Sequence, residues 1–121
     1  MRQEPLVIEE NADSQKGIRT LRLKGPIVIS NLFDFQNRLR SSTARALILD
    51  MTDVPYVDSA GVGVLVGAYV THQKDGRSLS LVGVSDRVRG TLSVTQVESF
   101  FRFFDSVATA EQANQSGVAA R

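Results

Sequence analysis

An acid and a hydroxyl interrupt the most apolar stretch of the chain, VPYVDSAGVGVLVGAYV at residues 54–70. Asp58 and Ser59 stand together where an apolar run long enough for a helix begins. Asp and Ser are favoured at helix N-termini, because their oxygens accept hydrogen bonds from backbone N–H groups that lack partners inside the helix. The pair therefore predicts a helix from about Ser59 to Lys74, ending at Gly76.

The hydroxyl of Ser59 could do more than cap a helix. A helix start offers free N–H donors and the positive end of the helix dipole, and both favour a phosphate group. Phosphorylation there would add about −1.5 to −2 charges at neutral pH and change the surface without unfolding the chain. From the residues alone, Ser59 is either a plain cap or a phosphoacceptor.

Three glycines follow the polar pair: Gly61, Gly63 and Gly67. Each one weakens a helix by about 1 kcal/mol relative to alanine, so each calls for a reason. Gly63 and Gly67 are four residues apart and share one face, which predicts close packing against the sheet or a neighbouring helix. Gly61 lies in the first turn, where we expect it to leave the N–H groups near Ser59 uncovered for an anion or a partner.

Strands and helices alternate around this segment. RALILDM at 45–51 is typical of a central strand covered on both faces. Segments 5–10 and 18–25 predict an antiparallel hairpin at a sheet edge, with a bulge at the Thr20–Leu21 step. The other expected elements are helices at about 32–40, 59–74, 85–94 and 109–120 and strands at 78–84 and 100–104. The predicted fold is α/β, with a mixed, mostly parallel sheet, right-handed crossovers and about four helices.

Local signals predict how two of the helices begin. Ser30 or Asn31 can cap the first helix, and Thr109 with Gln112 has the capping-box spacing for the last. The apolar stripe predicted for the first helix consists of Leu32, Phe33, Phe35, Gln36 and Leu39.

Composition limits the class of protein. A length of 121 residues with 42% hydrophobic residues leaves room for one core, so we expect a single domain over 1–121, frayed from about residue 116. Fourteen basic and thirteen acidic residues give a net charge of +1, which favours neither nucleic acid nor membrane lipid. Cysteine is absent, which excludes disulfides and thiolate-bound metals. Neither a signal peptide nor a bilayer-length apolar run is present, so we expect a soluble, cytoplasmic protein.

Two enzyme-like alternatives use the same residues. Asp50, Asp53 and Asp58 could gather beyond the central strand and hold Mg²⁺; otherwise Asp50 and Asp53 bond to loop N–H groups and Asp58 caps the helix. A serine hydrolase would need a histidine beside Ser59. The only histidine, His72, lies about 20 Å away at 1.5 Å per helical residue and is predicted to be solvated. We therefore expect no enzymatic activity, metal or cofactor.

The segment ALILDMTDVPYVDSAGVGVLVGAYVTHQKDG resembles the core signature of STAS domains, which include the anti-sigma factor antagonists. That signature is an apolar strand ending in Asp, a short loop with an aromatic residue, then Asp-Ser-Ser/Ala-Gly and a glycine-containing helix. The rest of the chain follows in the family's order. The matching positions are Asp50, Tyr56, Asp58, Ser59, Ala60, Gly61 and Gly63.

The resemblance implies a regulatory mechanism. Ser59 would be the phosphoacceptor, and the unphosphorylated protein would bind an anti-sigma factor and so free a sigma factor for transcription. The anti-sigma factor is often itself a serine kinase, phosphorylation breaks the complex, and a phosphatase resets it. A homodimer is left open. The implied partner-binding residues at the helix start are Asp58, Ala60, Gly61, Gly63 and Tyr56, with Asp50 and Asp53 in support.

Two departures from the family pattern are visible. GPIVIS at 25–30 lacks the acidic turn that often follows the second strand, and is more similar to STAS domains of sulfate-type transporters. TQV at 95–97 lacks the glycine of the usual small-Gly-Leu step. The first departure keeps an alternative function open: a STAS scaffold subunit of a stress-sensing or transport complex, without a phosphorylation switch.

Overall fold

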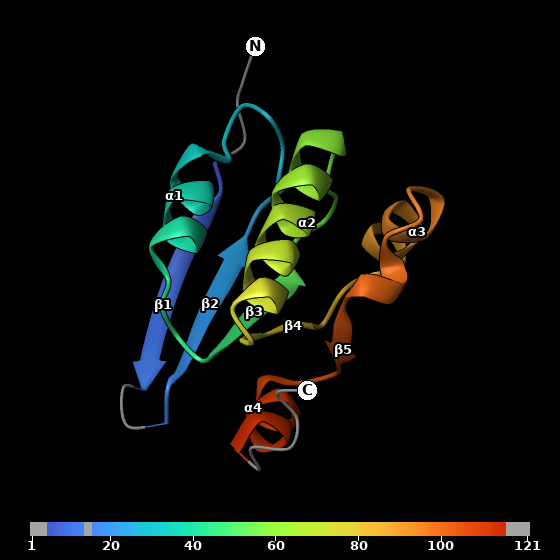
Figure 1. Cartoon of the computed structure of the whole chain (residues 1–121). Helices are drawn as coiled ribbons and strands as arrows, with labels where there is room; N and C mark the ends of the chain where they lie inside the picture. Colours follow the sequence, from blue (N-terminus) through green and yellow to red (C-terminus); the bar gives the residue numbers. More distant parts are fainter. Residues whose placement is uncertain (1–4, 14–15, 116–121) are drawn as a thin grey trace.

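The computed structural model describes residues 5–13 and 16–115, which form one five-stranded sheet with helices on both faces (Figure 1). Fraying from about residue 116 lies outside the described residues. In chain order the elements are β1 (Val7–Asp13), β2 (Ile18–Lys24), α1 (Phe33–Ser41), β3 (Ala46–Asp53), α2 (Ser59–Lys74), β4 (Ser78–Val82), α3 (Asp86–Val94), the 3-10 turn η1 (Glu98–Phe100), β5 (Arg102–Phe104) and α4 (Val107–Gln115).

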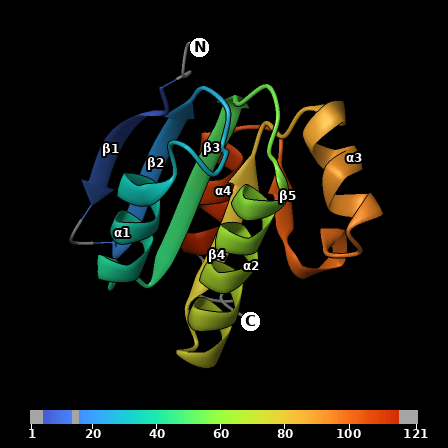
Figure 2. The ribbon, with the colours of Figure 1, turned by 90° about the horizontal axis from the view of Figure 1, so that it is seen from above.

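The strands lie side by side in the order of the sequence, β1-β2-β3-β4-β5. β1 and β2 form an antiparallel hairpin, and the remaining neighbours are parallel. Right-handed crossovers that always step in one direction place every connecting helix on the same face. Accordingly α1, α2 and α3 cover one face, and α4 covers the other (Figure 2). The predicted α/β class, edge hairpin and four helices are confirmed.

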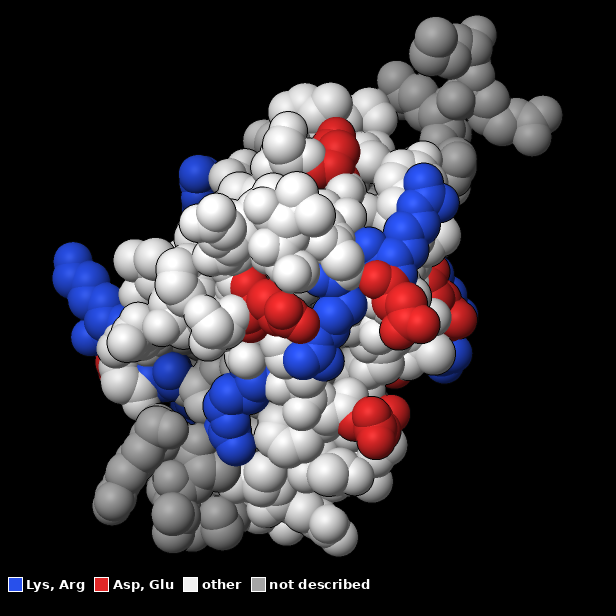
Figure 3. Space-filling view, turned by 90° about the vertical axis from the view of Figure 1, so that its right-hand side faces the viewer, with Lys and Arg blue, Asp and Glu red and all other residues white. Residues whose placement is uncertain are grey.

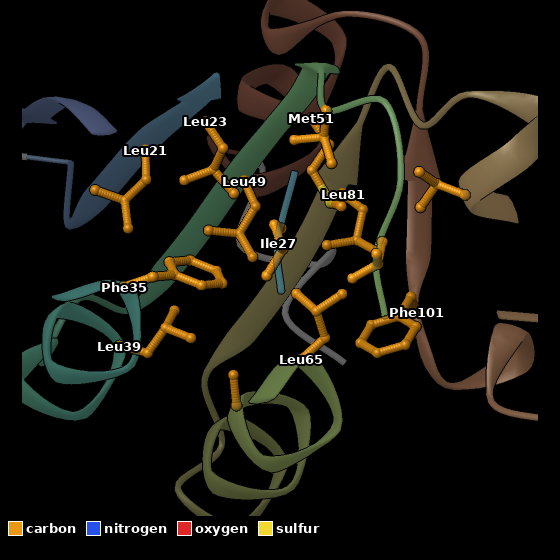
Figure 4. Close-up of a cluster of buried hydrophobic side chains, with 14 of the residues drawn as sticks. Leu21, Leu23, Ile27, Phe35, Leu39, Leu49, Met51, Leu65, Leu81 and Phe101 are labelled. Carbon is orange, nitrogen blue, oxygen red and sulfur yellow. The ribbon is translucent and has the colours of Figure 1, made fainter. Parts of the chain in front are cut away.

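The central strand β3 supplies both cores. Alternate side chains of a strand point to opposite faces, so Leu47 and Leu49 join the core under α1 and α2, whereas Ala46 and Ile48 join the smaller core under α4. Phe35 of α1 and Leu65 of α2 point into the larger core (Figure 4). The prediction that this strand is covered on both faces is confirmed.

No bulge lies at the Thr20–Leu21 step. The register of β2 against β3 is regular there and shifts only between Arg22 and Lys24. The apparent slip in the sequence arises because Ile18 belongs to the α4 core and Leu21 to the α1–α2 core, so both faces of β2 carry apolar residues.

Two of the predicted helix caps are wrong. α1 begins after Leu32 without a side-chain cap, because Asn31 instead bonds to Pro26 and Val28 in the preceding turn. Phe33 is 76% exposed and leaves the predicted buried stripe. α4 begins at Val107, where the Ser106 hydroxyl accepts the N–H of Thr109 at 3.1 Å, so Ser106 performs the capping assigned to Thr109.

Gln96 adopts a conformation that normally favours glycine. Its φ is +64°, in the left-handed region, after the end of α3. TQV at 95–97 lacks the usual glycine, but Gln96 adopts the backbone conformation that this glycine would adopt. It does so at some conformational cost, because it carries a Cβ.

His72 is buried on α2, contrary to the prediction that it is solvated. Its side chain is 2% exposed, and Nδ1 lies 2.7 Å from the carbonyl oxygen of Ala68. Because a carbonyl only accepts hydrogen bonds, Nδ1 donates, and the buried Nε2 is left without a partner among the described residues. Burial is the main cause that lowers the pKa of His72 below its ordinary 6.5, and Arg77 lowers it further against the opposing effects of Ala68 and Asp75.

We predict that the free energy of unfolding decreases as the pH falls from 7.5 to 5.5. The unfolded histidine takes up its proton near pH 6.5, whereas folded His72 takes it up only at lower pH, so acid favours the unfolded state. Urea unfolding at several pH values measures this decrease, and His72→Gln should remove it. Glu10 does not contribute to this decrease between pH 7.5 and 5.5. The hydrogen bond from Arg19 lowers the pKa of Glu10 from 4.5, so its stabilising contribution is lost only below pH 4.5. An unchanged decrease in His72→Gln would contradict the assignment.

Candidate functional site

The β3–α2 loop is fastened to the segment that leaves β2. Ile27 and Val57 form an isolated parallel bridge. The N–H of Ile27 donates to the carbonyl of Tyr56 at 3.2 Å, and the N–H of Asp58 donates to the carbonyl of Ile27 at 3.1 Å. GPIVIS at 25–30 is therefore held by backbone hydrogen bonds and forms one wall of the loop. The loop lies at the carboxyl edge of the sheet, where open α/β sheets present their ligand sites.

Asp58 joins that wall to α2 through both carboxylate oxygens. Oδ1 accepts the N–H of Gly61 at 2.9 Å and caps the helix. Oδ2 accepts the N–H of Ile29 at 3.0 Å. One carboxylate thus fixes the start of α2 and the loop that follows β2 relative to each other.

Because Asp58 caps α2, the side chain of Ser59 is not needed as a helix cap. Ser59 is the first residue of α2, its side chain is exposed, and its hydroxyl forms no hydrogen bond within residues 5–13 and 16–115. The backbone N–H groups of Ser59 and Ala60 also find no acceptor in those ranges. Ala60 is partly buried against the main core. A free hydroxyl beside two free donors can accept a phosphoryl group or a partner's polar atom.

The closely packed glycine is not one of the two predicted to pack closely. Gly61 is buried, and a Cβ there would overlap the carbonyl oxygen of Ile27 and the side chain of Val57. Gly63 and Gly67 are exposed, and a Cβ on either would touch nothing. The close packing predicted at Gly63 and Gly67 is therefore wrong for both and is found at Gly61 instead, while the N–H groups near Ser59 are uncovered by the described residues, as predicted.

The two supporting acids have partners of their own. Asp50 Oδ1 accepts the N–H and the hydroxyl of Thr52 at 3.1 and 2.6 Å; Thr52 lies within β3, so this bond is made inside the strand and not to a loop N–H group. Asp53 pairs with Arg22 at 3.1 Å, so the predicted bond to loop N–H groups is wrong for both acids. Within the described part of the chain, Asp, Glu and His side chains form no group of three or more that could hold a metal ion.

Arg87 is the residue of this site that sequence reasoning missed. Its guanidinium lies over the Tyr56 ring, 4.9 Å from the centroid, so α3 contacts the β3–α2 loop. In the sequence, SDRVRG showed only a pair of arginines, which indicates nothing by itself. The aromatic residue of the loop was the available signal, because arginine often stacks on exposed aromatic rings.

The surface around the loop is partly apolar. Ile29 is 73% and Phe33 is 76% exposed, and both follow the segment held by Asp58. On the side of the molecule where α3 lies, basic and acidic side chains are interspersed rather than gathered into a field of one sign (Figure 3). No helix among the described residues is long and apolar enough to cross a membrane.

Fold and site together define a class: a small, mostly parallel α/β domain with an exposed serine at the start of the helix that follows its central strand. Within that class, the STAS domain pattern matches residues 10–110. The chain belongs to the STAS domain family.

Several relatives carry regulatory names. An anti-sigma-B factor antagonist of Listeria monocytogenes is 41% identical over 49 residues, which is 40% of this chain and 43% of that protein. The match thus spans less than half of the relative's length. An anti-sigma factor antagonist of Mycobacterium paratuberculosis has the same fold, with a TM-score of 0.79, 16% identity and coverage of 91% of this chain and 94% of that one.

A third relative is known in two states. The antagonist SpoIIAA in its unphosphorylated form superposes with a TM-score of 0.74, 14% identity and coverage of 93% of this chain and 98% of that one. The phosphorylated form from Bacillus gives a TM-score of 0.70 at 12% identity, with coverage of 88% and 99%. At these identities the two structures show a shared fold.

We predict that Asp58→Ala destabilises the domain by about 1–3 kcal/mol, because it removes the helix cap and the bond to Ile29. Ser59→Ala should change stability by no more than about 0.5 kcal/mol, since the fold does not use its hydroxyl. Urea unfolding of the two variants measures the difference. Asp58→Asn keeps one acceptor oxygen and should fall between them. Equal losses for Asp58→Ala and Ser59→Ala would contradict this division of roles.

The glycines give a second matched comparison. Gly61→Ala should destabilise the domain by about 1–3 kcal/mol, because its methyl group would be forced into the Ile27–Val57 wall. Gly63→Ala should stabilise it by about 0.5–1 kcal/mol, because alanine is the better helix former and meets no neighbour. The midpoint temperature of thermal unfolding should therefore decrease in Gly61→Ala and increase in Gly63→Ala. A change of the same sign in both midpoint temperatures would contradict the predicted difference in packing between the two positions.

Proposed function

We propose that the protein is an anti-sigma factor antagonist, a protein-binding domain switched by phosphorylation of Ser59. The observation that carries the proposal is the division of labour at the start of α2. Asp58 performs the structural work, and Ser59 is left exposed with a hydroxyl that the described fold does not use. The names of the relatives support the same function.

The switch itself is a phosphoryl transfer. The Ser59 oxygen attacks the γ-phosphorus of ATP bound to a serine kinase, the hydroxyl proton passes to a base of the kinase, and ADP leaves. The anti-sigma factor is the proposed kinase. A phosphatase restores the hydroxyl by transferring the phosphoryl group to water. SpoIIAA, which has the same fold, is known in phosphorylated and unphosphorylated forms, and this supports the proposal.

The proposed partner surface surrounds Ser59. Ala60, Gly61 and Tyr56 shape the helix start, and Gly63 lies one turn further along the same face as Ser59. With no side chain at Gly63, a partner can approach the backbone of α2 closely. The exposed side chains of Ile29 and Phe33 add apolar area nearby. A dianion at Ser59 would have to lose its hydration shell at such an interface, so phosphorylation should break the complex.

The chain would act as one domain over 1–121, as a binding protein rather than an enzyme, without metal or cofactor, in the cytoplasm, and a homodimer stays open. Asp50 and Asp53 would act indirectly, because their bonds to Thr52 and Arg22 lie within β3 and between β3 and β2, at the strand end from which the loop departs.

We predict that candidate anti-sigma kinases from the same genome, incubated with the protein and ATP, add a single phosphate at Ser59. Intact mass measures the addition, and Ser59→Ala should abolish it. Ser59→Ala should bind the anti-sigma factor constitutively, whereas Ser59→Asp should bind it at least tenfold more weakly, because the added charge is desolvated at the interface.

Two outcomes would count against the switch. Equal affinity of the Ser59→Ala and Ser59→Asp variants for the anti-sigma factor would mean that charge at this position does not regulate binding. A domain left unmodified by every kinase would favour the alternative of a scaffold subunit, whose binding does not depend on Ser59.

A further inference from the structure

Arg87 contacts the loop that leads to the candidate phosphoacceptor, and its charge has no carboxylate partner among the described residues. Its guanidinium stacks on Tyr56, three residues before Ser59, and its side chain is exposed. Within residues 5–13 and 16–115 it forms no ion pair and donates no hydrogen bond. By contrast, each of these arginines is paired with a carboxylate: Arg19, Arg22, Arg38, Arg77 and Arg89.

Ser59 lies on the flank of α2 that faces the α3 segment. Residues 59, 62, 66 and 69 are spaced by three and four, so they follow one side of the helix. At the far end of that side, the Tyr69 ring stacks on Phe100 of η1 at 5.1 Å and meets Phe101 edge-on at 5.9 Å. η1 follows α3, and α3 lies beside α2 on the same face of the sheet (Figure 2). This spacing places Ser59 on the half of α2 that is turned toward α3, the helix that carries Arg87.

The contact with the Tyr56 ring attracts the Arg87 guanidinium without using its hydrogen-bond donors. A cation over an aromatic face is attracted by the ring, and the edge of the guanidinium keeps its N–H groups free. Arginine held in this way needs little further ordering to bind an anion, and its planar group matches phosphate oxygens in pairs.

We propose that Arg87 is the receptor for the phosphate on Ser59, so that phosphorylation closes an ion pair between the start of α2 and α3. The inference rests on the proposed function, because it assigns a partner within the chain to the modified residue. The free N–H groups of Ser59 and Ala60 would bind the same phosphate from the helix side. Phosphorylated Ser59 would then be held against α3 rather than extended into solvent.

The test uses the full chain with phosphoserine installed at position 59 during translation. A ³¹P NMR titration follows the second ionisation of the phosphate, whose ordinary pKa is about 6. A nearby cation favours the dianion and lowers that pKa. We expect the pKa in Arg87→Gln to be higher than in the wild type by about half a unit to one unit, a difference that should shrink with added salt.

Arg89→Gln is the matched control. It removes the same charge from the same helix two residues away, but Arg89 is paired with Glu98 and stacked on Phe103. Its phosphate pKa should equal that of the wild type. Equal pKa values in the wild type and Arg87→Gln would overturn the inference, and so would an equal increase in Arg89→Gln, which would reveal only a general field.

The measurement separates this inference from the proposed function. Because the phosphate is installed directly, no kinase is required for the titration. Absence of phosphorylation by any kinase would remove the proposed function, whereas an unchanged pKa in Arg87→Gln would remove only the role of Arg87.

Discussion

The position of the site depends on one carboxylate. Asp58 accepts the N–H of Gly61 with one oxygen and the N–H of Ile29 with the other. The first bond decides where α2 begins, and the second fixes the segment that leaves β2 against it. A neutral side chain of similar size could satisfy one of these donors well but not both, since an amide has a single acceptor oxygen.

The arrangement frees Ser59 and explains the packed glycine beside it. For both bonds to form, the first turn of α2 must approach Ile27 closely, and only a residue without a Cβ fits at Gly61. Tyr56, held in the same loop, becomes the platform for Arg87. The polar pair of the sequence is thus divided between structure and surface, with Asp58 turned inward to the backbone and Ser59 outward.

Much of the fold could be read from the sequence, because periodicity and caps are local. The bounds of α2 and the double coverage of β3 follow from such patterns. The failures come from packing between distant segments. Gly61 is constrained by Ile27, more than thirty residues earlier, and His72 is buried by its position over the sheet. Local sequence patterns indicate neither the contact of Gly61 with Ile27 nor the burial of His72. The contact of Arg87 with the loop likewise depends on how distant segments pack together.

The edges of the sheet restrict how any other chain can attach. β5 is only three residues long, and β1 carries ionised side chains that pair with β2, among them Glu9 with Lys24 and Glu10 with Arg19. Short and charged edge strands are poor templates for adding a further strand. A partner chain therefore has to bind at the helices and loops rather than at the strand edges. Recognition there depends on side chains that a single modification can change. The domain is thereby protected against open-ended self-association through its backbone.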